Sequence, residues 1–267
     1  MTGPLLILGC GYTGSAVARR VLAQGRKVVA TVRSEESAAP LRDELAGPHF
    51  TLLVAPTLDE NIGQHVTPET HVIIAFPPDG STDARIAPAL ATARAITYVS
   101  STGVYGGRTG TIDHTTPLPE PASPRAQRIL DAESAYRAVG ATVLRCPGIY
   151  GKHRGLHMRI VRGEHRIPGD GSRTLSRIHV EDLASFALAA GATRGETLVI
   201  GDAEPARHIE VVRWVCETYG VPLPPSVPWE EVHETLRADR CVDASYARQR
   251  LGVELLFPTY REGMARG

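Results

Sequence analysis

The stretch that decides the fold is Pro4-Leu5-Leu6-Ile7-Leu8-Gly9-Cys10-Gly11-Tyr12-Thr13-Gly14. Its first part is a continuous apolar run, which is typical of a strand that is buried on both faces of a parallel sheet. Three glycines follow in the pattern G-x-G-x-x-G, and apolar residues then recur at helical spacing from Ala16 to Leu22. A glycine-rich turn that joins a strand to a helix indicates a dinucleotide-binding unit.

Each glycine of this turn has its own physical role. Gly9 permits the tight turn, Gly11 lets the backbone approach a pyrophosphate, and Gly14 lets the helix pack closely on the strand. The helix begins near Tyr12 and Thr13, where backbone N–H groups and the positive end of the helix dipole favour a phosphate. The alternative is a glycine-rich turn without a ligand. Because strand, spacing and helix agree, we predict that these five residues bind the cofactor.

Further apolar runs predict five more strands of the same sheet, at residues 27–32, 50–54, 71–76, 95–100 and 141–145. They alternate with helical patterns, of which residues 123–139 are the longest later example. Such alternation indicates βαβ units with right-handed crossovers. We therefore predict an α/β fold with a doubly wound parallel Rossmann sheet in the strand order 3-2-1-4-5-6.

The pattern loosens beyond Tyr150, which suggests a second, smaller part of the chain. We predict a dinucleotide-binding Rossmann domain over 1–150, with returns to it at about 179–202. Residues 151–178 and 203–267 are expected to form a small C-terminal substrate lobe. The prolines of 220–228 exclude both a helix and a central strand there.

The composition excludes several classes of protein. The 267 residues carry 29 Lys+Arg against 29 Asp+Glu, and only 5% are aromatic, which argues against a nucleic-acid partner. The four cysteines have no CxxC spacing, so neither a disulfide framework nor a structural zinc is expected, and a reducing, cytoplasmic location is favoured. The N-terminal apolar run is far shorter than the roughly 20 residues of a membrane span, so no membrane association is expected. The sequence is compatible with a homodimer.

The choice between the two nicotinamide cofactors is expected to depend on the end of the second strand. That strand ends Thr31-Val32-Arg33-Ser34, and no carboxylate follows until Glu35. An acidic residue there would accept hydrogen bonds from the ribose 2′-hydroxyl of NAD. Arg33 is instead placed to pair with a 2′-phosphate, and Ser34 to donate to it. We predict NADP as the preferred cofactor, with NAD and a merely solvated Arg33 as the alternatives.

Several ordered motifs together resemble the extended and atypical branches of the short-chain dehydrogenase/reductase superfamily, which include nucleoside-diphosphate-sugar epimerases and dehydratases. The resemblance covers nearly the whole chain. Besides the turn at 9–14, it is carried by Ser100-Ser101-Thr102-Gly103-Val104-Tyr105-Gly106, Arg145-Cys146-Pro147-Gly148-Ile149-Tyr150-Gly151 and Arg177-Ile178-His179-Val180-Glu181-Asp182-Leu183-Ala184. The run Phe257-Pro258-Thr259-Tyr260-Arg261-Glu262-Gly263 is similar to an uncharacterised bacterial subgroup of that branch.

The resemblance implies a nicotinamide that lies across the carboxyl edge of the sheet. Ser101 corresponds to the family's catalytic hydroxyl, with Thr102 beside it. The cofactor positions implied by the resemblance are Ser100, Ala75, Phe76 and Pro77, of which the last three lie toward the adenine side, and Pro147, Gly148 and Ile149 beside the nicotinamide. Ordinary packing at the strand ends is the alternative for each of them.

One departure from the family concerns its Tyr-x-x-x-Lys pair, in which the tyrosine acts as general acid or base. The chain has two lysines, Lys27 and Lys152, and neither follows a tyrosine by four residues. When the chain is aligned on Glu133, the tyrosine position is Arg125 and the lysine position is Ile129. Arginine stays protonated, so Arg125 cannot shuttle a proton, although it can bind an anion or polarise a carbonyl.

Substitute proton donors are available in loops. Tyr105 is one candidate, with a packed aromatic side chain as the alternative for it, and Tyr150, Asp113, His114, His153 and His157 are others. His153 and His157 would share one face of a helix, but no third ligand is near in the sequence, so we expect no metal site.

Residues 151–178 carry an excess of positive charge. Lys152 and six arginines stand there against Glu164 and Asp170 alone. Guanidinium groups bind phosphate or carboxylate in bidentate fashion, so we predict a small anionic substrate that contacts Tyr150, Arg154 and Arg177. A solvated charged surface is the equally open alternative. Leu175 replaces the family's phosphate-binding arginine, which puts a nucleotide-sugar substrate in doubt.

Two functions are consistent with these observations. The first is an NAD(P)-binding oxidoreductase or epimerase/dehydratase-like enzyme, acting on a small anionic, nucleotide-sugar-like substrate with a nonstandard proton donor. The second is a catalytically idle NADP-binding redox sensor or scaffold. Ser101 and the arginine-rich segment favour the enzyme, whereas Arg125 at the tyrosine position favours the sensor.

Overall fold

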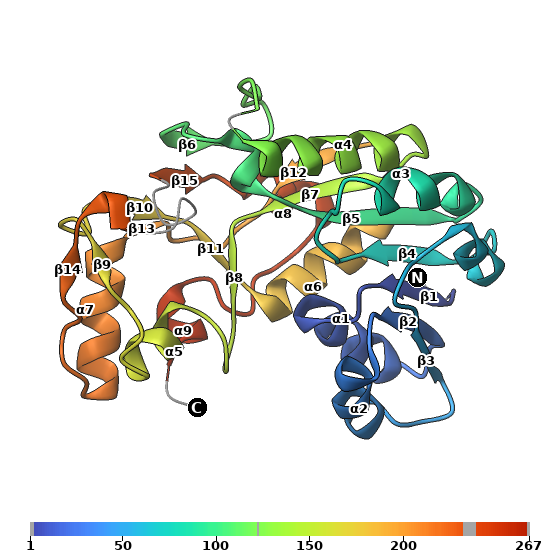
Figure 1. The fold of residues 1–267 in the computed structure, drawn as a ribbon, viewed down its shortest axis with the longest axis horizontal. Helices are drawn as coiled ribbons and strands as arrows, with labels where there is room; N and C mark the ends of the chain where they lie inside the picture. Colours follow the sequence, from blue (N-terminus) through green and yellow to red (C-terminus); the bar gives the residue numbers. More distant parts are fainter. Residues whose placement is uncertain (1–2, 122, 232–238, 266–267) are drawn as a thin grey trace. The chain divides into compact units, whose positions relative to one another are not determined.

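The computed structural model describes residues 3–121, 123–231 and 239–265 (Figure 1). The chain divides into two compact units. The first unit comprises residues 1–101, 127–145 and 184–198, and the second unit comprises 102–126, 146–183 and 199–267. The segment 102–126 therefore belongs to the same unit as residues 146–183 and 199–267.

A seven-stranded parallel sheet is the framework of the first unit. The strand order is β3-β2-β1-β4-β5-β7-β12, which confirms the predicted order 3-2-1-4-5-6 and adds β12 at the edge. In the register, Leu5 pairs with both Val28 and His71. The strands are β1 (Leu5–Leu8), β2 (Val28–Val32), β3 (Phe50–Val54), β4 (His71–Ile74), β5 (Ala95–Ser101), β7 (Thr142–Cys146) and β12 (Thr197–Val199).

The α-helices follow the expected alternation. The 15-residue helix α4 lies where residues 123–139 predicted it, and α6 follows the motif that begins at Arg177. The helices are α1 (Tyr12–Leu22), α2 (Glu35–Glu44), α3 (Thr82–Ile86), α4 (Pro124–Ala138), α5 (Leu156–Val161), α6 (Val180–Ala189), α7 (His208–Tyr219), α8 (Ser245–Leu251) and α9 (Tyr260–Gly263).

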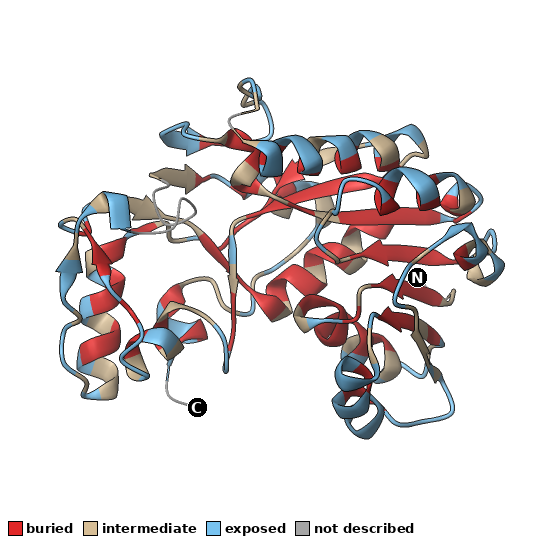
Figure 2. Ribbon diagram, viewed as in Figure 1, coloured by how far each residue is buried: buried red, intermediate tan, exposed pale blue. Residues whose placement is uncertain are grey.

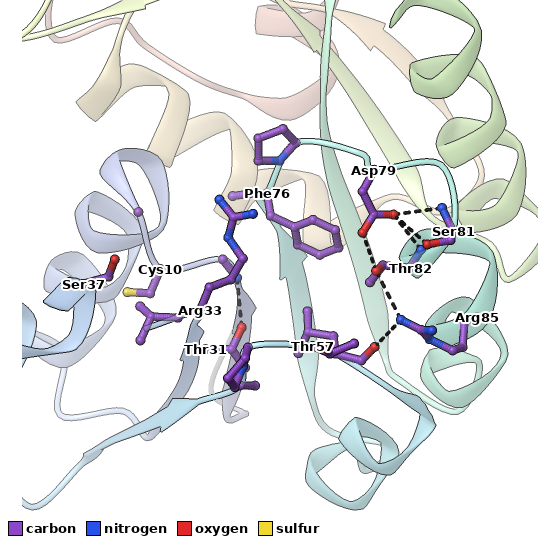
Figure 3. Close-up of a pocket in the computed structure, with 18 residues that line it drawn as sticks. Cys10, Thr31, Arg33, Ser37, Thr57, Phe76, Asp79, Ser81, Thr82 and Arg85 are labelled. Carbon is purple, nitrogen blue, oxygen red and sulfur yellow. Dashed lines mark hydrogen bonds between the residues drawn. The ribbon is translucent and has the colours of Figure 1, made fainter. Parts of the chain in front are cut away.

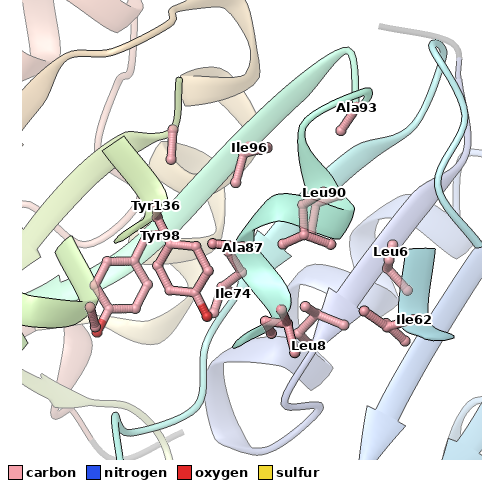
Figure 4. Close-up of a cluster of buried hydrophobic side chains, with 14 of the residues drawn as sticks. Leu6, Leu8, Ile62, Ile74, Ala87, Leu90, Ala93, Ile96, Tyr98 and Tyr136 are labelled. Atoms are coloured by element: carbon pink, nitrogen blue, oxygen red, sulfur yellow. The ribbon is translucent and has the colours of Figure 1, made fainter. Parts of the chain in front are cut away.

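The central strands are buried on both faces, as their continuous apolar sequences require (Figure 2). One core cluster of the first unit joins residues of β1, β4 and β5 to residues of α3 and α4 (Figure 4). Tyr98 and Tyr136 meet in this cluster with their ring centroids 4.9 Å apart. This packing supports the strands of the first unit, whose carboxyl ends carry predicted site residues such as Gly9, Ala75 and Ser101.

Short strand pairs build the second unit. They are β6 (Gly110–Ile112) with β15 (Arg240–Val242), β8 (Gly148–Tyr150) with β11 (Arg177–His179), β9 (Ile167–Pro168) with β14 (Ser226–Val227), and β10 (Thr174–Leu175) with β13 (Ala206–Arg207). A separate core packs α7 against residues that include Tyr150, Ile160 and Tyr260. Among the described residues, no helix has both the length and the apolar character that crossing a bilayer requires.

Candidate functional site

The turn between β1 and α1 has the geometry that its glycines predict. Gly9 has a φ of +90°, and a Cβ atom there would lie 2.8 Å from Phe76 Cβ and 2.9 Å from the Phe76 backbone nitrogen. A Cβ atom on Gly14 would lie 2.6 Å from the Gly9 carbonyl oxygen. Gly11 has open space around its missing Cβ. The missing side chains of Gly9 and Gly14 therefore allow the turn and the helix to pack closely. Gly11 leaves space through which a ligand can approach.

Thr31 holds this turn from the neighbouring strand. Its hydroxyl accepts a hydrogen bond from Gly9 N–H at 3.1 Å, and its carbonyl oxygen accepts one from Cys10 N–H at 2.7 Å. Thr31 is buried. The end of β2 thus fixes the shape of the turn.

The N-terminus of α1 is suited to an anion. No side chain in the described part of the chain caps it, and no acidic residue lies in its first turn. The first backbone hydrogen bond of the helix runs from Ser15 N–H to Gly11 O at 2.8 Å. The positive end of the helix dipole is therefore not neutralised by a carboxylate of its own first turn.

A pocket of about 470 Å³ in the first unit opens beside this turn (Figure 3). It brings together six predicted cofactor residues, namely Gly9, Gly11, Arg33, Ala75, Phe76 and Pro77. Its other lining residues were not predicted: Cys10, Thr31, Val32, Ser37, Ala55, Pro56, Thr57, Leu58, Asp79, Ser81, Thr82 and Arg85. Most of these follow β3 or β4, in loops or in the five-residue helix α3, which are too short to give a recognisable sequence pattern.

Arg33 and Ser34 differ in their surroundings. The Arg33 side chain is exposed and extends into the pocket (Figure 3), and among the described residues its guanidinium has no hydrogen-bond or ion-pair partner. Ser34 instead caps α2, because its hydroxyl accepts from Ser37 N–H at 3.3 Å and donates to Ser37 Oγ at 3.1 Å. Ser37 lines the pocket. The end of β2 thus presents a guanidinium that pairs with no described residue, and Ser37 of α2 lines the same pocket.

The far wall of the pocket is held by Asp79. Its Oδ1 accepts from the backbone N–H groups of Ser81 and Thr82, both at 2.8 Å, and its Oδ2 accepts from Thr82 Oγ1 at 2.6 Å. These hydrogen bonds hold the pKa of Asp79 well below its ordinary value. Arg85 closes the same wall by donating to Leu58 O at 2.9 Å.

The end of β5 carries two adjacent serines in different environments. Ser100 is buried and donates to Glu133 Oε1 at 2.6 Å, so its hydroxyl is used within the first unit. Ser101 is half-buried. At the position that corresponds to the family's lysine, Ile129 is buried. The ammonium group that the family places there has no equivalent on α4 at that position.

The other predicted catalytic residues belong to the second unit. Thr102 is buried, and Tyr105 is 1% exposed, which leaves its phenol little access to a ligand. Arg125 is exposed, and no described residue pairs with its guanidinium. Pro147 is half-buried, while Gly148 and Ile149 lie in β8 and pair with β11.

The predicted substrate residues also lie in the second unit. Arg154 is exposed. Arg177 is 6% exposed, and it donates to Leu175 O at 3.2 Å and to Glu204 O at 3.4 Å. Burial lowers the pKa of Arg177. Tyr150 is buried as well, and burial raises the pKa of its hydroxyl.

The shared helical face of His153 and His157 does not form. Helix α5 begins at Leu156, so His153 precedes it, and His157 is buried. The glycine at 155 explains this, because its φ of +137° interrupts helical geometry between the two histidines. In the described part of the chain, no group of three or more His, Cys, Asp or Glu side chains is arranged to hold a metal ion.

Comparison with known proteins adds to this geometry. A family model described as NADP oxidoreductase coenzyme F420-dependent matches residues 4–87, which contain the glycine turn and Arg33. A curated relative, 3-diazoavenalumate denitrifying reductase of Streptomyces sp, is 28% identical over 178 residues. That match covers 58% of each protein, so the chain spans little more than half of the reductase.

A solved structure decides the family. It is a functionally unknown conserved protein from Silicibacter pomeroyi DSS, with a TM-score of 0.83 and 30% identity over 98% of this chain and 96% of the other. The chain belongs to the same family as this protein. This chain also has the fold of MoeE5, whose structure holds UDP-glucose and NAD, at a TM-score of 0.78 and 22% identity over 98% and 96% of the two chains.

These likenesses confirm the resemblance drawn from the motifs. The fold is that of NAD-dependent epimerases and dehydratases with a Rossmann sheet. It is therefore an NAD(P)-binding, oxidoreductase-like or epimerase-like fold.

Proposed function

We propose that the protein is an NADP-dependent oxidoreductase that acts on a small anionic substrate. The observation that carries this conclusion is the guanidinium of Arg33, which pairs with none of the described residues and extends into the pocket beside the glycine turn. A guanidinium there complements a 2′-phosphate in charge and in bidentate geometry. No carboxylate stands at the end of β2 to accept a ribose 2′-hydroxyl.

In this proposal the pyrophosphate lies against the N-terminus of α1, where Gly11 leaves room for it. Tyr12, Thr13 and Gly14 contribute the first turn of the helix. Ala75, Phe76 and Pro77, which line the same pocket, would lie under the adenine side. Ser37, which was not predicted, takes the place assigned to Ser34, because the Ser34 hydroxyl is used to cap α2.

The substrate is expected to be anionic because exposed arginines concentrate in one segment. Arg154, Arg159 and Arg162 are all exposed. Arg177 is held by carbonyl oxygens, so we assign it to the fold in the observed conformation. A nucleotide sugar is one such anion, and MoeE5 binds one.

For the reaction, Ser101 would orient a carbonyl or hydroxyl, and Arg125 would stabilise developing negative charge. When a nicotinamide cofactor is bound, it supplies or accepts the hydride. Because Tyr105 is buried, we assign the role of proton donor or acceptor to an exposed loop histidine, His114 or His153, or to the substrate itself.

Calorimetric titration with NADPH and NADH tests the cofactor assignment. We expect tighter binding of NADPH, and Arg33→Ala should weaken NADPH binding by about tenfold or more, since a charge-assisted hydrogen bond contributes about 1.5–3 kcal/mol. NADH affinity should not change. Arg213→Ala, at an exposed arginine of α7, is the matched control. Equal affinities for both cofactors, unchanged in Arg33→Ala, would contradict the assignment.

A further inference from the structure

The pocket of the first unit is lined by a second arginine besides Arg33, which is Arg85 on α3. Arg85 belongs to a wall that is formed by α3, the loop before it and the loop after β3. We call this part of the lining the α3 wall. It consists of Thr57, Leu58, Asp79, Ser81, Thr82 and Arg85. All of these residues lie within 1–101, so the wall belongs to a single compact unit.

Two hydrogen bonds hold the guanidinium of Arg85 in place. Its Nη2 donates to Leu58 O at 2.9 Å and to Thr82 Oγ1 at 3.3 Å, which joins α3 to the loop after β3. Figure 3 shows the guanidinium turned from α3 toward the pocket. Among the described residues, none accepts a hydrogen bond from Nε or Nη1. Arg85 is exposed, so a ligand in the pocket can reach these two nitrogen atoms.

The carboxylate of the α3 wall does not neutralise Arg85. Asp79 Oδ1 accepts from Ser81 N–H and Thr82 N–H, both at 2.8 Å, and from Ser81 Oγ at 3.2 Å. Asp79 Oδ2 accepts from Thr82 Oγ1 at 2.6 Å. These hydrogen bonds engage both carboxylate oxygens within their own loop. The positive charge and the remaining donors of Arg85 are therefore directed to the pocket without a partner among the described residues.

The rest of the pocket suits a flat aromatic ring. Ala55, Pro56, Leu58 and Phe76 give it apolar surface. Its volume of about 470 Å³ lies in the range of about 300–1,000 Å³ that is typical of small-molecule sites, which combine apolar walls with a few placed polar groups. Apolar side chains can bury the faces of a heteroaromatic base, but the ring nitrogens at its edge then need hydrogen-bond donors.

We propose that Arg85 recognises the adenine base of the cofactor by donating a hydrogen bond from Nε or Nη1 to one ring nitrogen. This inference rests on the proposed function, in which Arg33 and the glycine turn take the two phosphate groups and the remaining lining is left for the base. Arginine stays protonated, so it donates at every pH at which the protein is folded. Because Leu58 and Thr82 already hold Nη2, the side chain loses little conformational freedom when the base binds.

Removing single ring nitrogens from the ligand tests this contact on the full chain. The probes are adenosine 2′,5′-bisphosphate and its three analogues in which N1, N3 or N7 is replaced by CH, and calorimetry measures their affinities. We expect one analogue to bind the wild-type chain about tenfold or more weakly than the parent, because a hydrogen bond to a charged group is lost. Arg85→Ala should bind the parent with a similar loss, and should bind that analogue no more weakly than the parent.

This coupling separates a direct contact from support of the wall. If Arg85 only held the loop after β3, the losses from Arg85→Ala and from the analogue would add, and additive losses would overturn the inference. Equal binding of all four probes by the wild-type chain would overturn it as well, even if Arg85→Ala failed to fold. Arg85→Gln, which keeps an amide donor without the charge, is the second variant, and Arg213→Ala is the control at an exposed arginine.

The same probes distinguish this inference from the proposed function. Arg33→Ala should weaken all four probes by the same factor, because it is assigned to the 2′-phosphate that they share. If the wild-type chain binds none of them, the cofactor assignment fails and this inference fails with it. If Arg33→Ala weakens binding but Arg85 shows no coupling to any ring nitrogen, this inference alone is wrong.

Discussion

Arg145 donates two hydrogen bonds to Glu133, from Nε to Oε1 at 3.0 Å and from Nη2 to Oε2 at 2.7 Å. Ser100 donates to the same carboxylate at 2.6 Å. Because β5 and β7 are neighbours in the sheet, a carboxylate of α4 ties together the ends of two strands. One of those ends carries Ser101, the hydroxyl that we place near the substrate. This buried triad therefore sets the geometry next to the proposed reaction.

Removing the carboxylate of this triad should be strongly destabilising. Glu133→Ala leaves the buried guanidinium of Arg145 without its partner, and such a loss typically costs about 3–5 kcal/mol. Urea unfolding followed by circular dichroism measures it. Glu35→Ala, which breaks the exposed pair with Arg42, should leave stability nearly unchanged. A similar small effect for both variants would show that the triad does not hold the sheet.

Substitutions at two glycines of the turn should separate an effect on folding from an effect on cofactor binding. Gly14→Ala places a methyl group 2.6 Å from the Gly9 carbonyl oxygen, so it should destabilise the fold by about 1–3 kcal/mol. Gly11→Ala meets no atom within 4 Å and should fold normally. Its methyl group would, however, occupy the approach of the pyrophosphate, so NADPH affinity should fall at least tenfold. Thermal melting and calorimetry measure the two effects, and normal NADPH binding by Gly11→Ala would contradict the placement of the pyrophosphate.

Acid should destabilise the fold through buried histidines. Burial lowers the pKa of His71 and of His165 to about 3 and that of His208 to about 4. In the unfolded chain these histidines bind protons near pH 6.5. Their contribution to the free energy of unfolding is therefore complete above pH 6.5 and is lost as the pH falls toward 4. Each histidine contributes a slope of about 1.4 kcal/mol per pH unit in this window.

His71→Gln, which keeps a polar group near Thr97, should remove one such slope between pH 6.5 and 5. His153→Gln, at an exposed position, should leave the slope unchanged. Urea midpoints measured across this pH range compare the three proteins. Parallel pH profiles for the wild-type chain and His71→Gln would show that His71 is not buried in its neutral form.

The central sheet could be predicted because its strands are local features of the sequence. Strands such as Leu5–Leu8 and His71–Ile74 are buried on both faces, so they appear as uninterrupted apolar runs. The glycine turn could be predicted for a similar reason, since the close approach to Phe76 admits no side chain at Gly9.

The rest depends on contacts between residues distant in the sequence. The Asp182 carboxylate accepts hydrogen bonds from the amides of Leu256 and Phe257. His165 Nε2 lies 3.0 Å from His208 Nε2. No spacing in the sequence predicts either contact. Ser34 and Ser37 show that residues close together in the sequence can also be hard to assign. Both are small and polar, and only the cap geometry of α2 shows which of them faces the pocket.

The reaction itself should depend on Ser101 and Arg125. NADPH oxidation, followed by absorbance, is measured against carbonyl-bearing sugar nucleotides and small keto acids. If Ser101 orients the reacting oxygen, Ser101→Ala should lower kcat by roughly 10²-fold, because one preorganised hydrogen bond is lost.

Arg125→Lys keeps the charge but not the planar fork, so a loss of activity there would indicate a bidentate anion contact. Ser100→Ala, which alters the neighbouring hydroxyl, reports how much of any loss arises from the Glu133 triad. Tight NADPH binding without turnover across the panel, together with a partner protein captured by one redox form alone, would favour a redox sensor over the oxidoreductase.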